Sequence, residues 1–427
     1  MKRLFLLLVC CLSLLCLHAQ QKHVILVTID GFRPDFYLED KWPTPHLKQM
    51  LPEGVHAYGV NSVFPSITYP SHTTIVTGVQ PYEHGIYYNG VFDPDSAGNK
   101  IYWNFHQIKA PTVWEAAQKA GLTVASLMWP ASAEAPASFN ISDIGGMGDE
   151  VRTKYARPKG VIDRIKQEVF HSDTDIDWGK DQKNAEVAAW VIQHLKPNLM
   201  TIHLFSVDHA EHMVGREGPM VSEAISDADS AVGIIRQAIK EAGIADSTLF
   251  IVTGDHGFYD VKKSVNPNVW LSKADLLDKA QFYAAGGSAY LFLRDKKDSQ
   301  TARQVMALLN ALPAEEKKYF RIVSRKEMDQ IGADPNVAFA LSGLEGAAFG
   351  NSRTGEALLE GKGGAHGYLP DTRNIQTGFI AVSPEIKKGV EIKEMDLRDI
   401  TVFINEYLHL DMPTVKGRPV AKYFDSL

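Results

Sequence analysis

Three apolar, β-branched stretches of this chain end abruptly in acidic or histidine side chains. They are residues 23–29, 199–207 and 247–253. Continuous apolar runs of this length are typical of strands buried on both faces of a parallel sheet. Helical patterns lie between them, at residues 112–121, 184–195 and 221–243. Strands that alternate with helices predict an α/β fold, in which a central, mostly parallel β-sheet is sandwiched by helices.

The residues directly after these stretches are of the kinds that bind metal ions. Asp30 follows the first stretch, Asp208 the second, and Asp255 with His256 the third. Sheets of this class bind their ligands beyond the carboxyl ends of the strands. We therefore expect these four side chains to meet at one rim of the sheet.

Two further histidines extend this set. His212 lies four residues after Asp208, so both share one face if a helix begins there. His366 lies in the glycine-rich loop 363–368. Together with the rim residues they make six oxygen and nitrogen ligands, which suit two borderline metal ions such as Zn²⁺.

A candidate nucleophile lies in the segment 64–78, where prolines flank Ile67, Thr68 and Tyr69 ahead of an apolar helix start. A hydroxyl at a helix N-terminus meets backbone N–H groups and a dipole that favour a bound phosphate. A neutral threonine becomes nucleophilic once a metal ion removes its proton. Spacing alone leaves four rivals to Thr68: Ser66, Ser71, Thr73 and Thr74.

The N-terminal residues 1–19 have a basic start, a short apolar run and a small residue, Ala19, at their end, which predicts a cleaved signal peptide. The segment also contains all three cysteines, Cys10, Cys11 and Cys16. We expect a secreted or periplasmic protein without transmembrane segment, disulfide or thiolate site. The bulky Leu14 and Leu15 before Cys16 argue against a lipoprotein anchor.

The remaining chain has two regions that interrupt the alternation of strands and helices. They are residues 131–181, rich in Gly, Pro and charge, and residues 284–361, with one strand-like piece at 287–293. We expect both to be lid-like insertions in one catalytic domain, residues 20–427. The formal charge of −7, without basic runs, argues against binding of a nucleic-acid polymer.

Several short motifs together resemble the nucleotide pyrophosphatase/phosphodiesterase family, within the alkaline phosphatase superfamily. In order they are Asp30-Gly-Phe-Arg33, Thr68-Tyr-Pro-Ser-His72, Thr77-Gly78, His84-Gly-Ile86 with Asn89, Asp208-x-x-x-His212, Asp255-His-Gly257 and His366-Gly-Tyr368. The resemblance spans about residues 22–412 and implies an alkaline-phosphatase-like fold.

The resemblance also implies roles for the matching positions. One zinc ion would be held by Asp208, His212 and His366, and the other by Asp30, Asp255, His256 and the Thr68 oxygen. Thr68 would attack the phosphorus of a small phosphate diester, forming a phospho-threonine that water then hydrolyses. Asn89 would donate to a phosphoryl oxygen, and Tyr69 would offer its ring to a nucleobase or another leaving group.

Two positions depart from the family pattern. Ser71 stands where the family usually has Asn, and Tyr69 where Phe is common. The second base-stacking tyrosine of the family has no clear counterpart within residues 131–155, so phosphodiester cleavage is better supported than nucleotide preference. The histidines outside the ligand set, His72, His84, His203 and His209, are interpreted as structural.

Four other functions compete with the cleavage of nucleotide-type diesters. A phosphomonoesterase on the same scaffold would need extra cations near the phosphate, for which the sequence offers Lys41, Lys48 and Lys100 without a motif. A phospholipid head-group phosphodiesterase would use the same chemistry. A sulfatase is disfavoured because no Ser-x-Pro-x-Arg sequence is present. A non-catalytic binding protein is disfavoured because every expected metal-ligand position holds a residue that can bind a metal ion. The sequence does not determine the oligomeric state.

Overall fold

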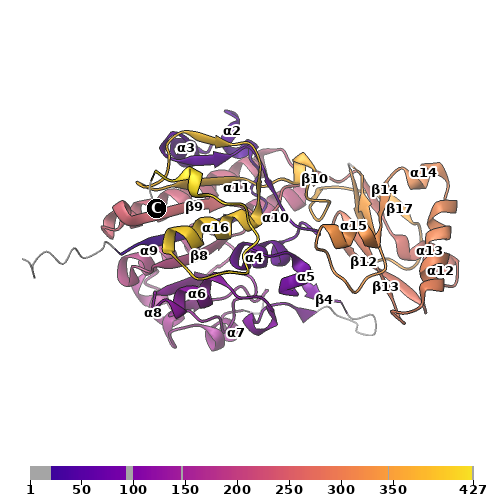
Figure 1. Cartoon of the computed structure of the whole chain (residues 1–427), viewed down its shortest axis with the longest axis horizontal. Helices are drawn as coiled ribbons and strands as arrows, with labels where there is room; N and C mark the ends of the chain where they lie inside the picture. Colours follow the sequence, from indigo (N-terminus) through magenta and orange to yellow (C-terminus); the bar gives the residue numbers. More distant parts are fainter. Residues whose placement is uncertain (1–20, 93–99, 146–147, 345, 426–427) are drawn as a thin grey trace, which may run out of the picture.

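The structure is a computed structural model that describes residues 21–92, 100–145, 148–344 and 346–425; the expected signal peptide, residues 1–19, lies outside these ranges. Its centre is an eight-stranded sheet (Figure 1). The strands are β1 (His23–Ile29), β2 (Val55–Ala57), β6 (Val124–Leu127), β7 (Phe139–Ile141), β8 (Leu199–Leu204), β9 (Thr248–Thr253), β19 (Phe379–Val382) and β20 (Val390–Ile392).

The order of strands across this sheet is β20-β2-β19-β9-β1-β8-β6-β7. β1 pairs in parallel with β8 and with β9, and β6 pairs in parallel with β8 and with β7. β19 runs antiparallel to its neighbours β9 and β2. The sheet is therefore mostly parallel, as the apolar runs predict.

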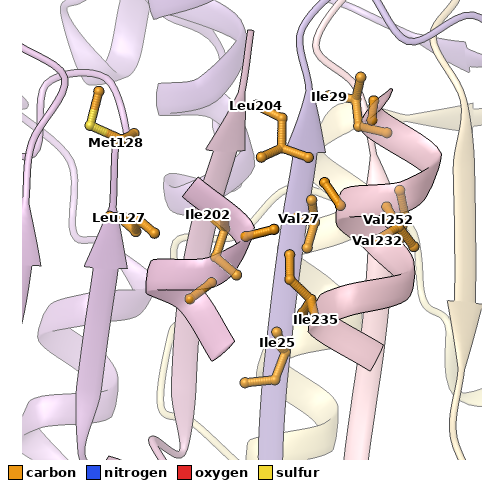
Figure 2. Close-up of a cluster of buried hydrophobic side chains, with 14 of the residues drawn as sticks. Ile25, Val27, Ile29, Leu127, Met128, Ile202, Leu204, Val232, Ile235 and Val252 are labelled. Carbon is orange, nitrogen blue, oxygen red and sulfur yellow. The ribbon is translucent and has the colours of Figure 1, made fainter. Parts of the chain in front are cut away.

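Helices cover both faces of the sheet because side chains alternate along each strand. Ile25 and Val27 face a layer that contains α9 (Asp181–Leu195) and α11 (Pro219–Glu241). Val24 and Leu26 face the opposite layer, whose helices are α4 (Thr68–Thr77), α6 (Val113–Lys119) and α16 (Leu397–Leu408). Figure 2 shows the first layer, with Val232 and Ile235 of α11 packed over β1 and β9. The predicted sandwich of helices around a central sheet is confirmed.

The second predicted strand is shorter than expected. β8 ends at Leu204, and helix α10 (Ser206–Val214) begins two residues later. The carboxylate of Asp181 accepts hydrogen bonds from the backbone N–H groups of Phe205, at 2.7 Å, and of Ser206. A carboxylate at this position favours a helix start. Asp208 consequently lies in the first turn of α10 rather than at the end of a strand.

Residues 263–361 contain a second lobe, at the right of Figure 1, with its own apolar core. Where the sequence predicts one strand-like piece, an antiparallel sheet of order β12-β13-β15-β14 is present. The strands of this sheet are β12 (Ala280–Ala285), β13 (Ser288–Leu293), β14 (Phe320–Val323) and β15 (Ala340–Gly343). The lobe also contains the strands β11 (Lys263–Val265), β16 (Ala347–Phe349) and β17 (Leu358–Glu360) and the helices α12 (Pro267–Lys273), α13 (Ser299–Ala311), α14 (Ala314–Lys317) and α15 (Arg325–Gln330). Two of the extra strands of the sheet, β12 and β15, are rich in Ala, Gly and Ser, and Ala and Gly carry little strand propensity. The third, β14, has strand-favouring residues but is only four residues long.

The region 131–181 is built into the main layer. Its strand β7 lies at the edge of the central sheet, and its helix α8 (Val161–Glu168) buries Ile162 and Ile165 in the core. Its helix α7 spans Gly148–Tyr155. A lid function for this region stays a prediction. Within the described ranges, no helix is both long and apolar enough to cross a membrane.

Candidate active site

The structure brings the six predicted metal ligands together as two groups of three. The first group, here called the buried triad, contains Asp30, Asp255 and His256, whose ligand atoms all lie within 4.8 Å of one another. Nε2 of His256 lies 3.1 Å from Oδ2 of Asp255 and 3.3 Å from Oδ1 of Asp30. All three side chains are buried at the carboxyl ends of β1 and β9.

The second group, here called the open triad, contains Asp208, His212 and His366. The Nε2 atoms of the two histidines are 3.1 Å apart, and Oδ1 of Asp208 lies 3.4 Å from one and 3.5 Å from the other. The His212 side chain is 43% exposed, so this triad opens to solvent. The rings of His366 and His256 stack at 3.7 Å, which places the two triads side by side.

Several ligand-type atoms in the two triads are buried without a hydrogen bond. Within the described part of the chain, Oδ1 of Asp30, Oδ1 of Asp208, Oδ2 of Asp255 and Nε2 of His256 have no such partner. Buried polar atoms almost always have a hydrogen-bond partner. A buried carboxylate without a partner or a cation loses the free energy of hydration that it has in water. Carboxylate oxygen and imidazole nitrogen are donors that divalent metal ions such as Zn²⁺ accept, so each triad is chemically suited to hold a metal ion.

The electrostatics agree with this fit. Burial, and then the charge of Asp208, raises the pKa of Asp30 well above its ordinary value. Burial, and then the charge of Asp30, does the same to the pKa of Asp255. Burial, followed by repulsion from His366 and His212, lowers the pKa of His256 well below its ordinary value. Without a cation the carboxylates repel one another, whereas a bound cation would stabilise them and bind the neutral imidazole.

The two imidazole rings of the open triad are oriented through their second nitrogen. Nδ1 of His212 lies 3.0 Å from the carbonyl oxygen of Gly364, and Nδ1 of His366 lies 3.2 Å from that of Ser66. When Nδ1 carries the proton and donates it to the carbonyl, Nε2 keeps its lone pair for a metal ion. The loop of His366 is in turn held beside β9, because β18 (Gly364–Ala365) pairs with β10 (Tyr259–Asp260).

The second lobe also anchors the His366 loop. The backbone N–H of Gly287, in the turn between β12 and β13, donates to the carbonyl oxygen of His366 at 2.6 Å. At Gly286, which has φ +65°, a Cβ atom would lie 2.2 Å from the same oxygen. Only glycine therefore permits this close approach of the two backbones.

The loop that carries Thr68 is attached to both triads. The backbone N–H of Gly367 donates to the carbonyl oxygen of Ser66 at 2.9 Å, beside His366. The Ser62 hydroxyl donates to the carbonyl oxygen of Asp255 at 2.6 Å. Nδ1 of His72 lies 2.8 Å from the Thr68 carbonyl oxygen and 3.6 Å from Oδ2 of Asp255. Thr68 is the first residue of α4, at the helix N-terminus that the sequence predicts.

The four rival hydroxyls are all buried and engaged with protein partners. Ser66 donates to the carbonyl oxygen of Tyr368 at 2.9 Å, and Thr73 to that of Tyr69 at 2.8 Å. The Ser71 hydroxyl contacts that of Ser62 at 3.0 Å, and the Thr74 hydroxyl contacts Nε2 of His84 at 3.1 Å. Thr68 alone among the five candidates is partly exposed.

Asn89 and Tyr69 lie next to Thr68. The Asn89 side-chain oxygen accepts the backbone N–H of Tyr69 at 3.0 Å, so the amide N–H₂ group is the part of this side chain that can donate. The Tyr69 hydroxyl donates to Asp143 at 3.1 Å, and the Tyr69 side chain is 5% exposed. Little of its ring is open to a leaving group in this structure, so its contact with substrate stays a prediction.

His203 is a residue whose place in the site the sequence did not reveal. It is buried and satisfied, as a core histidine should be, but Nε2 lies 3.1 Å from Oδ2 of Asp30. Its neighbour on β1 is Thr28, two residues before Asp30. The sequence contains one signal for this contact: His203 is a polar residue within an apolar strand, and that strand pairs with the strand that leads to Asp30.

The other three histidines interpreted as structural lie outside both triads. His84 is buried between the Thr74 hydroxyl and the backbone N–H of Ile86. His209 is exposed on α10, away from the shared face of Asp208 and His212. His72 bridges the Thr68 loop to Thr28 of β1, at 2.8 Å.

Comparisons with known proteins agree with this geometry. The family model of type I phosphodiesterase / nucleotide pyrophosphatase matches residues 24–368. Human ectonucleotide pyrophosphatase/phosphodiesterase family member 5 is 29% identical over 247 residues, which are 56% of this chain and 46% of that protein. The rat family member 7 is 24% identical over 395 residues, which are 88% of this chain and 81% of that protein. The present chain thus spans less than half of the human relative.

A solved structure shares the fold. Murine ectonucleotide pyrophosphatase/phosphodiesterase 5, in an inactive form in complex with AMP, has a TM-score of 0.68 and 22% identity. The match covers 95% of this chain and 100% of the murine chain. Because the family model covers most of the chain, including both triads and Thr68, the sequence resemblance is confirmed: the chain belongs to the type I phosphodiesterase / nucleotide pyrophosphatase family of enzymes.

Proposed function

We propose that this chain is a two-zinc hydrolase that cleaves phosphodiester or pyrophosphate bonds in nucleotides or related small diesters, with Thr68 as the nucleophile. The observation that carries the proposal is the contrast among five hydroxyls in one loop. Four are buried and engaged, whereas Thr68 is partly exposed at the N-terminus of α4, in a loop bonded to both triads.

The zinc ions, one in each triad, would supply the positive charge that activates the Thr68 hydroxyl and stabilises the departing oxygen. Thr68 Oγ1 attacks phosphorus in line, the bond from phosphorus to the leaving oxygen breaks, and Thr68 becomes a phospho-threonine. Water then hydrolyses this ester, which regenerates Thr68 and releases a phosphomonoester. Backbone N–H groups of the first turn of α4 favour the binding of the phosphoryl oxygens, and the side-chain amide of Asn89 would donate to one of them.

The substrate class follows from the relatives and from the charges around the site. The murine relative is described in complex with AMP, and we infer a nucleotide-type diester for this chain as well. A phosphomonoesterase is the weaker alternative. Lys41 is paired with Glu39 and Glu217 at 3.0 Å, and Lys48 donates to the carbonyl oxygen of Trp42 at 2.7 Å, so both are engaged with protein groups. A phospholipid head-group diester would use the same residues.

For the domain and the location we keep the expectation from the sequence. We propose one catalytic domain over residues 20–427, in which the regions 131–181 and 284–361 border the site, in a secreted or periplasmic enzyme. If bound substrate slows proteolytic cleavage within these two regions, the proposal that they border the site is supported.

The test compares Thr68→Ala with Thr77→Ala, a matched change at the other end of α4, where the hydroxyl donates to the Thr73 carbonyl oxygen. We expect Thr68→Ala to lower turnover of bis-p-nitrophenyl phosphate by about a thousand-fold or more, because the nucleophile is lost. Zinc content should stay close to that of the unchanged protein. Thr77→Ala should retain turnover. Retained activity in Thr68→Ala would refute the nucleophile, and faster cleavage of p-nitrophenyl phosphate than of the diester would refute the substrate class.

A further inference from the structure

A buried ion pair lies behind the two triads and takes no part in the proposed chemistry. Nε of Arg33 lies 3.1 Å from Oε1 of Glu211. The side chains are 1% and 0% exposed, respectively. The Arg33 guanidinium also lies 3.1 Å from Asp35 and stacks over the ring of Phe36, at 4.3 Å from its centroid. Arg33 is therefore held on several sides.

The pair joins the two backbone segments that carry the triads. Arg33 lies three residues after Asp30, in the turn that follows β1. Glu211 lies on α10, between Asp208 and His212 and directly before the latter. The ion pair thus connects a segment of the buried triad to a segment of the open triad, 178 residues apart in the chain (211 minus 33).

The turn after β1 is shaped to receive the Glu211 carboxylate. Gly31 has φ +74°, and a Cβ atom there would lie 2.8 Å from Oε2 of Glu211 and 3.0 Å from the ring of Phe258. The glycine lets the backbone next to Asp30 pack directly onto the carboxylate. The Phe258 ring also contacts the rings of His212 and His366, with centroids at 4.9 Å and 5.1 Å.

The same network reaches the third ligand-bearing segment. Asp35, the second partner of Arg33, lies 3.6 Å from the guanidinium of Arg216. Arg216 donates to the backbone carbonyl oxygens of Phe258 and of Asn374, the latter at 3.2 Å. Phe258 follows Asp255 and His256 closely in sequence. The segments after β1 and β9 and helix α10 are therefore tied by one set of charges.

We propose that the ion pair of Arg33 and Glu211 is a positioning element that sets the relative placement of the two triads and thereby the affinity for both zinc ions. The inference rests on the two-zinc function proposed above. Both side chains are enclosed by the protein, so each would act through the backbone next to a ligand. Groups behind metal ligands commonly tune metal affinity in this way.

The first test measures zinc binding to the full chain carrying Glu211→Gln, which keeps the shape of the side chain and removes its charge. We expect the zinc dissociation constants of both sites to rise by about 10- to 100-fold. Competition with a chromophoric chelator measures them without any activity assay. The matched control is Asp229→Asn, a buried carboxylate of α11 that accepts the backbone N–H groups of His46 and Leu47. Its thermal stability should fall while zinc affinity is unchanged.

The second test separates positioning from packing. Replacing a buried ion pair by apolar side chains often preserves stability, so Arg33→Met combined with Glu211→Met should fold even if Glu211→Gln does not. We expect this double variant to bind zinc at both sites more weakly than the unchanged protein does. Zinc affinity equal to that of the unchanged protein in the double variant would overturn the proposal, as would equal losses in Glu211→Gln and Asp229→Asn.

The measurements distinguish this inference from the proposed function. If the unchanged protein binds two zinc ions and Glu211→Gln binds both as tightly, only the positioning role is wrong. If the unchanged protein binds no zinc, the two-zinc function itself is wrong.

Discussion

The two triads use the same kinds of ligand but differ in how the chain supports and exposes them. The buried triad comes from the ends of neighbouring strands, β1 and β9, and all its side chains are enclosed. The open triad combines a helix with a glycine-rich loop, and its His212 is 43% exposed. The buried triad therefore depends on a cation to compensate enclosed charges, whereas solvent can stabilise part of the open triad.

The largest contrast should come from removing one ligand in each triad. Asp255→Asn is expected to lower kcat/KM by about a thousand-fold or more, because it removes a zinc ligand. It should also raise the melting temperature of the metal-free protein, since burial and Asp30 both disfavour the Asp255 charge. His212→Ala should lower activity and leave the metal-free melting temperature nearly unchanged. Calorimetry with and without chelator measures both; a fall in metal-free stability for Asp255→Asn would contradict the comparison.

Chelation should remove zinc from the two triads in sequence. The open triad should lose its ion first because its ligands are more accessible, and activity should then disappear reversibly. At a free zinc concentration about a hundred times the dissociation constant, each site adds about 2.7 kcal/mol to the free energy of unfolding. Metal analysis during timed dialysis follows the loss, and zinc should restore activity better than magnesium. If both ions are lost at the same rate, the open triad does not release its ion more readily than the buried triad.

His203→Gln should act on the buried triad alone. The change removes the contact of His203 with Asp30, and we expect about 10- to 100-fold weaker zinc binding there. The matched control is His23→Gln, at the opposite end of β1, where the buried histidine contacts the carbonyl oxygen of Pro197 at 2.8 Å. Chelator competition should show a change at one site of the first variant and none in the second. Equal weakening of both sites would show that His203 acts beyond Asp30.

Gly286→Ala should disturb the open triad through the second lobe. The new methyl group would meet the carbonyl oxygen of His366, and the left-handed backbone adds strain of about 1–3 kcal/mol. Gly355→Ala is the control, because its φ is +86° but no atom lies within 4 Å of its Cβ position. Urea unfolding should show some destabilisation in both, and zinc titration should show weaker binding in Gly286→Ala only. Unchanged zinc binding would mean that the lobe does not position His366.

The last contrast is the pH dependence of the metal-free protein, which involves no change in sequence or in activity. The pKa values of Asp30 and Asp255 are raised by burial, so the folded state retains protons that the unfolded chain has released. Stability should therefore fall as pH rises, by at most about 1.4 kcal/mol per pH unit for each proton. The lowered pKa of His256 acts in the opposite direction below about pH 6.5. Urea unfolding from pH 6.5 to 9 should show the fall with chelator and a reversed slope with zinc; a flat profile with chelator would contradict it.

The rim was the part of the site that could be predicted, because its signals are local. Asp30 and Asp255 follow apolar runs that form the strands β1 and β9, and the alternation of strands and helices indicates a parallel sheet. Parallel strands that neighbour one another bring their carboxyl ends together. Asp208 and His212 share a helix face because four residues separate them, although the exact start of α10 depends on the distant Asp181.

Other parts could not be predicted because they depend on contacts between distant segments. His203 has the pattern of a core residue, and only the pairing of β8 with β1 brings it to Asp30. Spacing alone does not separate the four extra hydroxyls of the Thr68 loop from Thr68. The family resemblance favours Thr68, and the structure adds that the other four are buried against protein partners. The second lobe was missed as a folded unit because its strands β12 and β15 have weak strand patterns and β14 is only four residues long.

The sequence by itself determined the fold class, the family and the kinds of side chain available to bind metal, since periodicity and short motifs are properties of neighbouring residues. The tertiary structure alone decided that one of the two predicted ligand groups is buried and the other open to solvent, and that Arg33 and Glu211 meet behind them. The physical reason is that burial, desolvation and ion pairing depend on which distant segments pack together. Those quantities exist only once β1, α10, β9 and the His366 loop have come together.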